Sequence, residues 1–396
     1  MDNKNKNPNV PNLRFPFYDK PWQITTIGNC CRSLDYGLGA SAIDYDGKHK
    51  YIRITDIDEE TNTFSNINIT SPSYYDEEHK VKINDILFAR TGASVGKTYC
   101  YNPKDGELYY AGFLIAAHVK NEFDPKFIFY NTVTTRYKNW VKIMSARSGQ
   151  PGINADEYRS HTFYIPIKDE QLKISAFLSK LDERILLQNK IIEDLIALRK
   201  SIIERTFSLV NSSWNKFTFN DIFIERKEMH IKDSSVIHAT LSKEGIFPKT
   251  DRYDRDFLVK DEDKKYKVSY LNDICYNPAN LKFGVITRNN YGKCIISPIY
   301  VTYEVKPNFN PKFIELFVTR SAFLKEIRKY EQGTVYERMA VSSDDFLTYT
   351  TRLPDVDFQN EIVSKIDLFD KKITQEKIYL ELLKNQKNYL LSNLFI

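Results

Sequence analysis

The sequence lacks the features that mark membrane, secreted or metal-binding proteins. None of its apolar runs approaches the roughly 18–20 residues that a membrane-spanning helix requires, and the Asn- and Lys-rich start, 1–12, does not resemble a secretory signal. Only five of the 396 residues are cysteine, and neither these nor the six histidines have the spacing of a zinc site or a catalytic triad. We therefore expect a cytoplasmic protein with reduced thiols and no bound metal.

A strong net charge is also missing, since the sequence carries only +5 at neutral pH. Segment 169–207 has as many basic as acidic residues, and segment 354–396 has one more acidic than basic residue. The positive excess therefore belongs to the rest of the chain. Such a distribution suits attraction of phosphate groups there, although so small an excess is weak support by itself.

The sequence does contain an internal repeat, at an offset close to 188 residues. The matching segments, in the same order in both copies, are Asn84-Asp85-Ile86 with Asn272-Asp273-Ile274, Asp124-Pro125-Lys126-Phe127-Ile128 with Asn310-Pro311-Lys312-Phe313-Ile314, Pro166 with Pro354, Gln171 with Gln359, Asp182 with Asp370, and Phe207 with Phe395. Chance does not produce such an ordered series, so we interpret the chain as two copies of one unit.

Within each copy the composition changes at a proline. Before Pro166 and Pro354 the sequence is rich in Tyr, Phe, Ile, Val and Thr in short runs, which favours many short strands. Helices are expected there over 125–144 and 311–331. After each proline, glycine disappears and helix formers dominate. The predicted fold is therefore α+β, with domains 1–165 and 211–353 and long helices in 166–210 and 354–396.

The two long helices share a heptad pattern, in which side chains recur at alternating spacings of four and three. The seam residues are Leu181, Ile185, Gln188, Ile192, Leu195, Arg199 and Ile202 in the first copy, and Phe369, Ile373, Glu376, Leu380, Leu383, Lys387 and Leu390 in the second. The polar positions coincide between copies, as expected where they set register. We predict an antiparallel coiled coil with pseudo-two-fold symmetry; the alternative is that each helix packs on its own domain.

Several motifs carry a resemblance to a known family. They are Asn84-Asp85-Ile86-Leu87-Phe88-Ala89-Arg90-Thr91-Gly92-Ala93-Ser94-Val95-Gly96-Lys97 and Gly149-Gln150-Pro151-Gly152-Ile153-Asn154 in the first half, Glu170-Gln171 followed by Phe177-Leu178-Ser179-Lys180-Leu181-Asp182-Glu183-Arg184-Ile185 in the first helix, and Tyr276-Asn277-Pro278 with Ser297-Pro298-Ile299-Tyr300 in the second half. With these motifs the chain resembles the specificity subunit of a type I restriction-modification enzyme. The resemblance extends over essentially the whole chain after the first dozen residues, and the helix motif is the most specific part.

The resemblance implies a non-catalytic subunit with two target-recognition domains that bind a split, asymmetric site in double-stranded DNA. The helices would set the unread spacer and dock two modification subunits, which carry the methyltransferase and its S-adenosylmethionine. Separate restriction and translocase subunits would use ATP and magnesium. Two departures stand out: the second helix opens with Asp357-Phe358-Gln359 in place of Asp169-Glu170-Gln171, and no residues follow it to extend back over the first domain.

Loops with Arg, Lys, Asn and Gln are the candidates for base and phosphate contacts, because these side chains match the exposed edges of guanine and adenine. The candidate DNA-binding residues are Arg90, Thr91, Ser94, Lys97, Arg147, Ser148, Gln150 and Asn154 in the first half, and Asn277, Asn280, Lys282, Arg288, Asn290, Lys293, Gln332, Tyr336 and Arg338 in the second.

Three segments imitate catalytic motifs. Segment 92–98 resembles a phosphate-binding loop but has three residues between its glycines where four are needed, and a strand-like run follows it. Segment 277–280 lacks the second proline and the aromatic residue of a methyltransferase loop, and the acidic residues in 251–263 lie in a Lys- and Asp-rich stretch typical of a solvated loop. Two alternatives therefore stay open: a self-sufficient methyltransferase or nuclease, and a coiled-coil protein that does not bind DNA.

Overall fold

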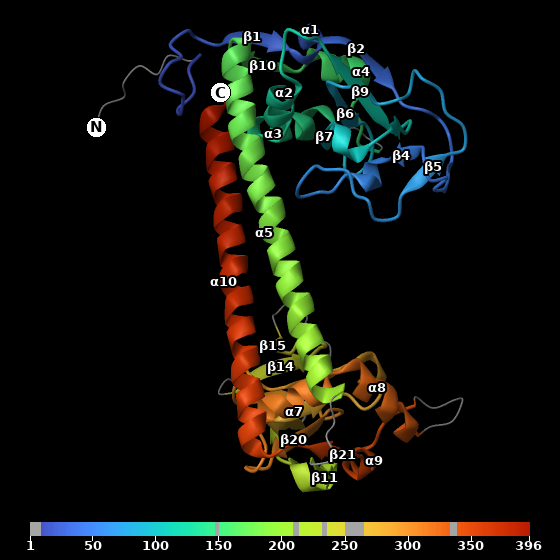
Figure 1. Ribbon diagram of the computed structural model, residues 1–396, viewed down its shortest axis with the longest axis vertical. Coiled ribbons are helices and arrows are strands. Elements are labelled where there is room, and N and C mark those ends of the chain that lie inside the picture. Colours follow the sequence, from blue (N-terminus) through green and yellow to red (C-terminus); the bar gives the residue numbers. More distant parts are fainter. Residues whose placement is uncertain (1–8, 147–149, 209–213, 232–235, 250–264, 333–338) are drawn as a thin grey trace. The chain divides into compact units, whose positions relative to one another are not determined.

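The computed structural model describes residues 9–146, 150–208, 214–231, 236–249, 265–332 and 339–396. The chain divides into two compact units. Unit 1 comprises Met1–Lys190 together with Lys377–Ile396, and unit 2 comprises Ile191–Glu376. Each unit therefore contains a globular part and a section of both long helices (Figure 1). In the described residues, no helix is both long enough and apolar enough to span a bilayer.

Unit 1 is built on a four-stranded antiparallel sheet. Its order is β2 (Cys31–Tyr36), β9 (Leu114–Val119), β6 (Asp85–Ala89) and β7 (Thr98–Cys100). Three strand pairs surround it: β1 (Gln23–Thr26) with β10 (Thr162–Ile165), β3 (Ala42–Asp44) with β5 (Thr70–Pro72), and β4 (Lys50–Ile52) with β8 (Leu108–Tyr110). The helices are α1 (Ile27–Cys30), α2 (Pro125–Thr132), α3 (Thr135–Met144) and α4 (Ala155–Ser160), with 3-10 turns η1 (Ile54–Asp56) and η2 (Pro103–Asp105).

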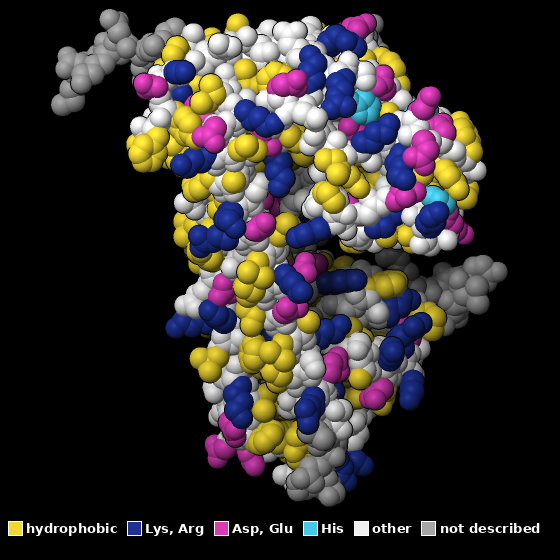
Figure 2. Space-filling model, turned by 45° about the horizontal axis from the view of Figure 1, so that its top comes forward, with side chains coloured by type: hydrophobic (Ala, Val, Ile, Leu, Met, Phe, Trp, Pro, Cys, Tyr) yellow, Lys and Arg dark blue, Asp and Glu magenta, His cyan; other side chains and the backbone are white. Residues whose placement is uncertain are grey.

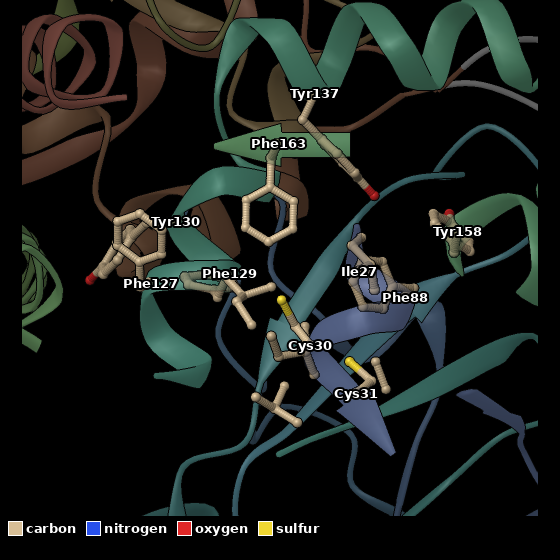
Figure 3. Close-up of a cluster of buried hydrophobic side chains, with 14 of the residues drawn as sticks. Ile27, Cys30, Cys31, Phe88, Phe127, Phe129, Tyr130, Tyr137, Tyr158 and Phe163 are labelled. Atoms are coloured by element: carbon tan, nitrogen blue, oxygen red, sulfur yellow. The ribbon is translucent and has the colours of Figure 1, made fainter. Parts of the chain in front are cut away.

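The core of unit 1 lies between this sheet and its helices. Phe88 of the sheet, Phe127 of α2 and Phe163 of β10 are almost completely buried, and Figure 3 shows them converging around Ile27 and Cys30. Burying side chains of this size removes a large apolar area from water, at about 25 cal/mol per Å².

One predicted helix of unit 1 is divided. The sequence favoured a single helix over 125–144, whereas α2 ends at Thr132 and α3 begins at Thr135. The hydroxyl of Thr134 accepts a hydrogen bond from the backbone N–H of Tyr137 and so caps α3, while Asp124 caps α2. Each cap starts a new helix because it satisfies N–H groups that have no partner inside the helix. The second predicted helix, 311–331, is also divided, since α7 ends at Val318 and α8 begins at Ser321, although no side chain of the described residues caps α8.

Unit 2 repeats the central sheet of unit 1 in the same order. Its strands are β12 (Phe223–Glu225), β20 (Val301–Val305), β17 (Ile274–Tyr276) and β18 (Ile286–Arg288). A five-stranded sheet is added, in the order β13 (Met229–Ile231), β16 (Lys265–Ser269), β19 (Cys294–Ile296), β14 (Ile237–Leu241) and β15 (Ile246–Pro248). The pair β11 (Asn215–Thr218) with β21 (Thr350–Leu353) corresponds to β1 with β10. The helices are α6 (Phe219–Ile222), α7 (Pro311–Val318), α8 (Ser321–Ile327) and α9 (Ser343–Thr348), with 3-10 turns η4 (Leu281–Phe283) and η5 (Arg328–Tyr330).

The two long helices are α5 (Lys168–Ser208) and α10 (Val356–Leu394), and they pair with opposite directions in each unit. In unit 1, Nζ of Lys387 lies 2.7 Å from Oδ1 of Asp182. In unit 2, Nε of Arg199 lies 2.6 Å from Oδ1 of Asp370. As residue numbers rise along α5 they fall along α10, so the antiparallel coiled coil is present. The seam residues named above are all buried or half-buried.

The C-terminal ends of the two long helices also pack on the globular parts. The end of α5, from the first copy of the repeat, packs in unit 2, and the end of α10, from the second copy, packs in unit 1. Phe207 near the end of α5 lies in the core of unit 2, with its ring 5.0 Å from that of Phe313. Phe395, directly after α10, lies in the core of unit 1, 5.2 Å from the ring of Phe127. The end of α10 is therefore itself part of the core of unit 1.

Candidate nucleic-acid interface

In unit 1 the two loops predicted to contact DNA lie side by side. Thr91 and Gly152 form an antiparallel bridge. The backbone N–H of Gly92 donates to the carbonyl of Pro151 at 3.0 Å, and that of Ile153 donates to the carbonyl of Arg90 at 2.9 Å. The loops after β6 and before α4 thus form a single surface, although 50 residues or more separate them in the sequence.

Arg90 is held in a defined orientation on this surface. Its guanidinium carbon lies 4.8 Å from the centre of the Tyr36 ring, and Nη1 donates weakly to the carbonyl of Gly112 at 3.4 Å. The Tyr36 hydroxyl in turn accepts the N–H of Ala155 at 3.2 Å, which fixes the ring against α4. A stacked guanidinium loses little freedom on binding, so Arg90 is well prepared to contact an anionic or guanine-like acceptor.

Other candidates in unit 1 are occupied by internal contacts. Nζ of Lys97 donates to the carbonyl of Ile57 at 3.1 Å and lies 3.4 Å from Glu59. Asn154 caps α4 by accepting from the N–H of Glu157 at 2.8 Å. Ser94 is half-buried in the turn between β6 and β7, whereas Gln150 is exposed and Thr91 is half-exposed beside it. Arg90, Thr91 and Gln150 are therefore the groups best placed for an external ligand; Arg147 and Ser148 lie outside the described residues.

The turn at 92–98 leads directly into strand β7, as predicted, and no helix follows it. Gly96 adopts a positive φ of 85°, and a Cβ there would lie 2.6 Å from the methyl groups of Val141. Its glycine is therefore required by packing and backbone conformation. A phosphate-binding loop needs a helix N-terminus at this point, so the turn does not have the form of a nucleotide-binding loop.

In unit 2, four of the predicted residues have structural partners. Oδ1 of Asn277, itself 8% exposed, accepts the N–H of Ala279 at 3.1 Å. Arg288 forms an ion pair with Glu315 at 3.0 Å and donates to Asn272 at 2.8 Å. Nε2 of Gln332 donates to Asp345 at 2.9 Å, and Nζ of Lys282 lies 4.0 Å from Glu331. These contacts hold the loops in shape. The four side chains could contact a ligand only after giving up their present hydrogen-bond or ion-pair partners.

Two predicted residues of unit 2 are exposed and close together, Asn290 and Lys293. They follow β18, in the turn that Asn289 closes by accepting the N–H groups of Tyr291 and Gly292. Nζ of Lys293 lies 5.5 Å from the Tyr270 ring. Asn280 is half-exposed at the start of η4, while Tyr336 and Arg338 lie outside the described residues, as does the acidic stretch in 251–263.

A polar cleft of about 740 Å³ in unit 1 was missed by the sequence reasoning. His118 of β9 lines it, and its Nδ1 is 2.6 Å from Asp85 while its Nε2 is 3.2 Å from Asp35. The hydrogen bond to Asp85 raises the pKa of His118 above its ordinary value, although burial opposes the change. Arg32 and Lys82 also line the cleft, so cationic and anionic groups alternate there.

The repeated Asn-Asp motif explains the position of that histidine. Asn84 and Asn272 both adopt a positive φ, 73° and 75°, in the turn before the second sheet strand of each unit. The following aspartates, Asp85 and Asp273, accept a backbone N–H three residues earlier, at 2.7 and 2.8 Å. In unit 2 the partner of Asp273 is Arg226, at 2.9 Å. The repeat therefore encodes a turn with a buried carboxylate, and only the cation differs.

Opposite charges are mixed over the surface shown in Figure 2, with no broad field of one sign. Among the described residues, no three His, Cys, Asp or Glu side chains are grouped so that they would hold a metal ion. The overall charge therefore does not locate a nucleic-acid site, and the site has to be found from individual exposed polar and basic side chains.

Comparison with known proteins identifies the first half of the chain. Residues 21–196 match the family model of the type I restriction modification DNA specificity domain. The first β-rich part and α5 as far as Ile196 are therefore similar to this DNA specificity domain. The putative type I restriction enzyme MjaX specificity subunit of Methanocaldococcus jannaschii is 28% identical over 198 residues, which cover 47% of this chain and 45% of that protein. The chain thus matches about half the length of this relative.

Solved structures of this family share the fold over nearly the full chain. The crystal structure of a type I restriction-modification S subunit from M. genitalium has a TM-score of 0.57 at 16% identity, and the match covers 98% of this chain and 99% of that one. A chain from a structure of type I system assembly and conformational transition also has a TM-score of 0.57, at 13% identity, and covers 94% and 98%. The two β-rich parts and two long helices are therefore the fold of a specificity subunit.

Proposed function

We propose that this chain is the DNA-specificity subunit of a type I restriction-modification system, and that it binds a bipartite, asymmetric site in double-stranded DNA. The observation that supports this most directly is that the two units share one arrangement of strands but expose different polar side chains. Both units have the same order of strands in the central sheet and the same turn before one of its inner strands, β6 in unit 1 and β17 in unit 2. A shared framework suits two similar recognition domains, one for each part of the site.

The asymmetry of the site is inferred from the groups that each unit offers. Unit 1 presents Arg90, Thr91 and Gln150 on two joined loops, whereas unit 2 presents Asn290 and Lys293 on the turn after β18. Base edges in the major groove are distinguished by such donor and acceptor patterns. Because the two sets differ in type and in place, they would read different bases.

We further propose that the long helices dock two modification subunits. The support is a set of apolar side chains on α5 and α10 that stay exposed in each unit: Leu186, Leu187, Ile378 and Leu382 in unit 1, and Ile196, Leu198 and Leu368 in unit 2. Exposed apolar side chains on paired helices suit a protein contact surface when a partner covers them. S-adenosylmethionine, ATP and magnesium would belong to the modification and restriction subunits, and the complex would work in the cytoplasm.

The test is reconstitution with modification subunits, followed by mapping of methylated adenines in DNA. We expect methylation at a split site with two different half-sites, and neither methylation nor cleavage by the purified chain alone. Catalysis by the chain alone, or S-adenosylmethionine binding to it, would favour a self-sufficient enzyme. Absence of salt-dependent binding to duplex DNA in the complex would instead favour a coiled-coil protein without a nucleic-acid ligand.

A further inference from the structure

Unit 2 contains a cleft of about 630 Å³ that the DNA-binding predictions reach only in part. It is bounded by the second half of α5, by α7 and α8, and by the turn between β14 and β15. The basic residues that line it are Arg199, Lys200, Lys243, Arg288, Lys312 and Arg320. The acidic ones are Glu204, Glu244, Glu315 and Asp370. The lining therefore has more cationic than anionic groups.

The acidic groups of the cleft already have partners. Asp370 lies 2.6 Å from Nε of Arg199 and 2.7 Å from Nζ of Lys312, and Glu315 binds Arg288 at 3.0 Å. Glu244 accepts the Ser242 hydroxyl at 2.7 Å, and Glu204 accepts that of Ser321 at 3.5 Å.

Three cations of the cleft remain without a carboxylate at ion-pair distance, as far as the described residues extend. They are Lys200 on α5, Lys243 in the β14–β15 turn, and Arg320 at the start of α8. Lys200 and Lys243 are exposed, while Arg320 is half-buried.

Arg320 is the most constrained of these cations. Its guanidinium carbon lies 4.2 Å from the centre of the Phe207 ring and 4.4 Å from that of Phe317. Nε donates to the carbonyl of Phe317 at 3.2 Å. Burial lowers the pKa of Arg320, which means that its charge is poorly solvated. Glu204 and Glu326 partly offset this burial, although neither lies at ion-pair distance. An anion bound directly to Arg320 in the cleft would stabilise its charge further. The planar guanidinium matches the two oxygens of a phosphate.

The cleft also adjoins a predicted base-reading position. Asn290 lines it and is exposed, and Arg288 lies on the same wall. We propose that the cleft holds backbone phosphates of the DNA duplex beside the second half-site, with Arg320, Lys200 and Lys243 as ligands. The inference rests on the proposed function and adds to it that α5 contacts the DNA backbone through Lys200. Such contacts position the duplex and carry no base information.

The experiment measures binding of the chain, assembled with its modification subunits, to a duplex that contains the mapped site, at several salt concentrations. The test variant is Lys200→Ala/Lys243→Ala, because both side chains are exposed and neither supports the core. The control is Lys216→Ala/Lys371→Ala, which removes the same charge from exposed positions of unit 2 outside the cleft. Arg320→Gln is the third variant, with assembly and thermal unfolding measured alongside.

Two lost phosphate contacts should lower the slope of log K against log salt by about 1.8, since each contact contributes about 0.9. The control should change it much less, and the methylated sequence should stay the same for all variants. Equal slopes for test and control would overturn the proposal. So would a cleft variant that assembles more weakly with the modification subunits but keeps the slope once assembled, because the cleft would then bind a partner's carboxylates. If the unmodified complex shows no site preference at all, the proposed function itself fails, and that outcome is distinct from these.

Discussion

Gln171 and Gln359, 188 residues apart, make the same two hydrogen bonds in the two units. Oε1 of Gln171 accepts the N–H of Asp124 at 3.0 Å, and Nε2 donates to the carbonyl of Pro166 at 2.8 Å. Gln359 accepts the N–H of Asn310 at 2.9 Å and donates to Pro354 at 2.9 Å. Both side chains are almost completely buried. Each glutamine therefore joins the start of its long helix to the N-cap residue of a helix in the globular part, α2 in unit 1 and α7 in unit 2.

Replacing either glutamine by methionine should destabilise its unit. Gln171→Met leaves one buried N–H and one buried carbonyl without partners, each worth about 1–3 kcal/mol, so we expect a loss of about 2–4 kcal/mol in the free energy of unfolding. Gln359→Met should cost a similar amount. Chemical denaturation of the full chain measures both. Gln386→Met, at an exposed position of α10, is the control and should change little; equal effects at all three positions would contradict the structural role.

These glutamines also mark what the sequence could and could not reveal. Their repetition was visible, and the change of composition at Pro166 and Pro354 placed the starts of the long helices two residues before those of α5 and α10, while the heptad pattern showed which side chains face the seam. The hydrogen bonds that the repeated residues make were not predictable, since they depend on backbone groups 47 residues away for Gln171. The break between α2 and α3 was missed because the capping role of Thr134 is a local preference that an apolar pattern does not record.

Asp370 should stabilise unit 2 at neutral pH and lose this role in acid. Burial alone would raise its pKa, but hydrogen bonds from Arg199 and Lys312 outweigh burial and hold the pKa below its ordinary value. A carboxyl group with a lowered pKa contributes stability above its unfolded pKa of about 3.9, and this is lost as pH falls through the folded value. We expect Asp370→Asn to cost about 1–2 kcal/mol at pH 7 and progressively less below about pH 4. Urea unfolding at several pH values measures this.

The control is Asp367→Asn, at a more exposed residue that contacts Lys312. It should change the free energy of unfolding less than Asp370→Asn does. A cost for Asp370→Asn that stays constant with pH would contradict the role of this carboxylate.

His161 should make unit 1 sensitive to acid. Burial lowers its pKa to about 4, with a smaller effect from Arg136, and its Nδ1 has no hydrogen-bond partner in the described structure. A histidine with a lowered pKa contributes stability above its unfolded value of about 6.5, and this is lost as pH falls toward 4. The loss at pH 4 would be roughly 3 kcal/mol.

His161→Leu should remove this acid dependence, because leucine fills the apolar site without a titrating group. Thermal unfolding between pH 7 and pH 4 gives the measurement. His118→Asn is the matched comparison: the pKa of His118 is raised by Asp85, so its stabilisation is present below about pH 6.5 and lost as pH rises through the folded value. The two variants should therefore alter opposite sides of the pH profile. An unchanged acid limb in His161→Leu would show that other groups govern it.

Gln150 and Lys97 should differ in their effects on DNA recognition, although the sequence placed both among the candidates. Gln150 is exposed, so Gln150→Ala should cost about 1–3 kcal/mol of discrimination at one position of the first half-site and leave the second half-site unchanged. Lys97 is held by Ile57 and Glu59, so Lys97→Ala should alter base preference much less. Methylation rates on substrates with single changed base pairs measure both. A broad loss of selectivity from Lys97→Ala, with none from Gln150→Ala, would reverse the ranking.

That ranking could not come from the sequence. Glu59 lies 38 residues before Lys97, and nothing in either local pattern indicates that they meet. The same applies to Arg288, whose partner Glu315 is 27 residues away. Residue type identifies groups able to contact DNA, but the fold decides which of them are already paired, so the candidate site was only partly predictable.

The spacer length should follow the length of the paired helices. In each unit the ion pair between α5 and α10 keeps one register, Asp182 with Lys387 and Arg199 with Asp370. Seven residues inserted after Lys190 and seven after Glu376 preserve the heptad pattern in both helices. They add about 10.5 Å at about 1.5 Å per residue, or about three base pairs at about 3.4 Å each.

We expect the methylated site to gain about three base pairs between unchanged half-sites. Insertion in α5 alone should abolish activity, because it shifts one helix against the other and separates the ion pairs. If the half-sites changed while their spacing did not, the helices would not be the element that sets it.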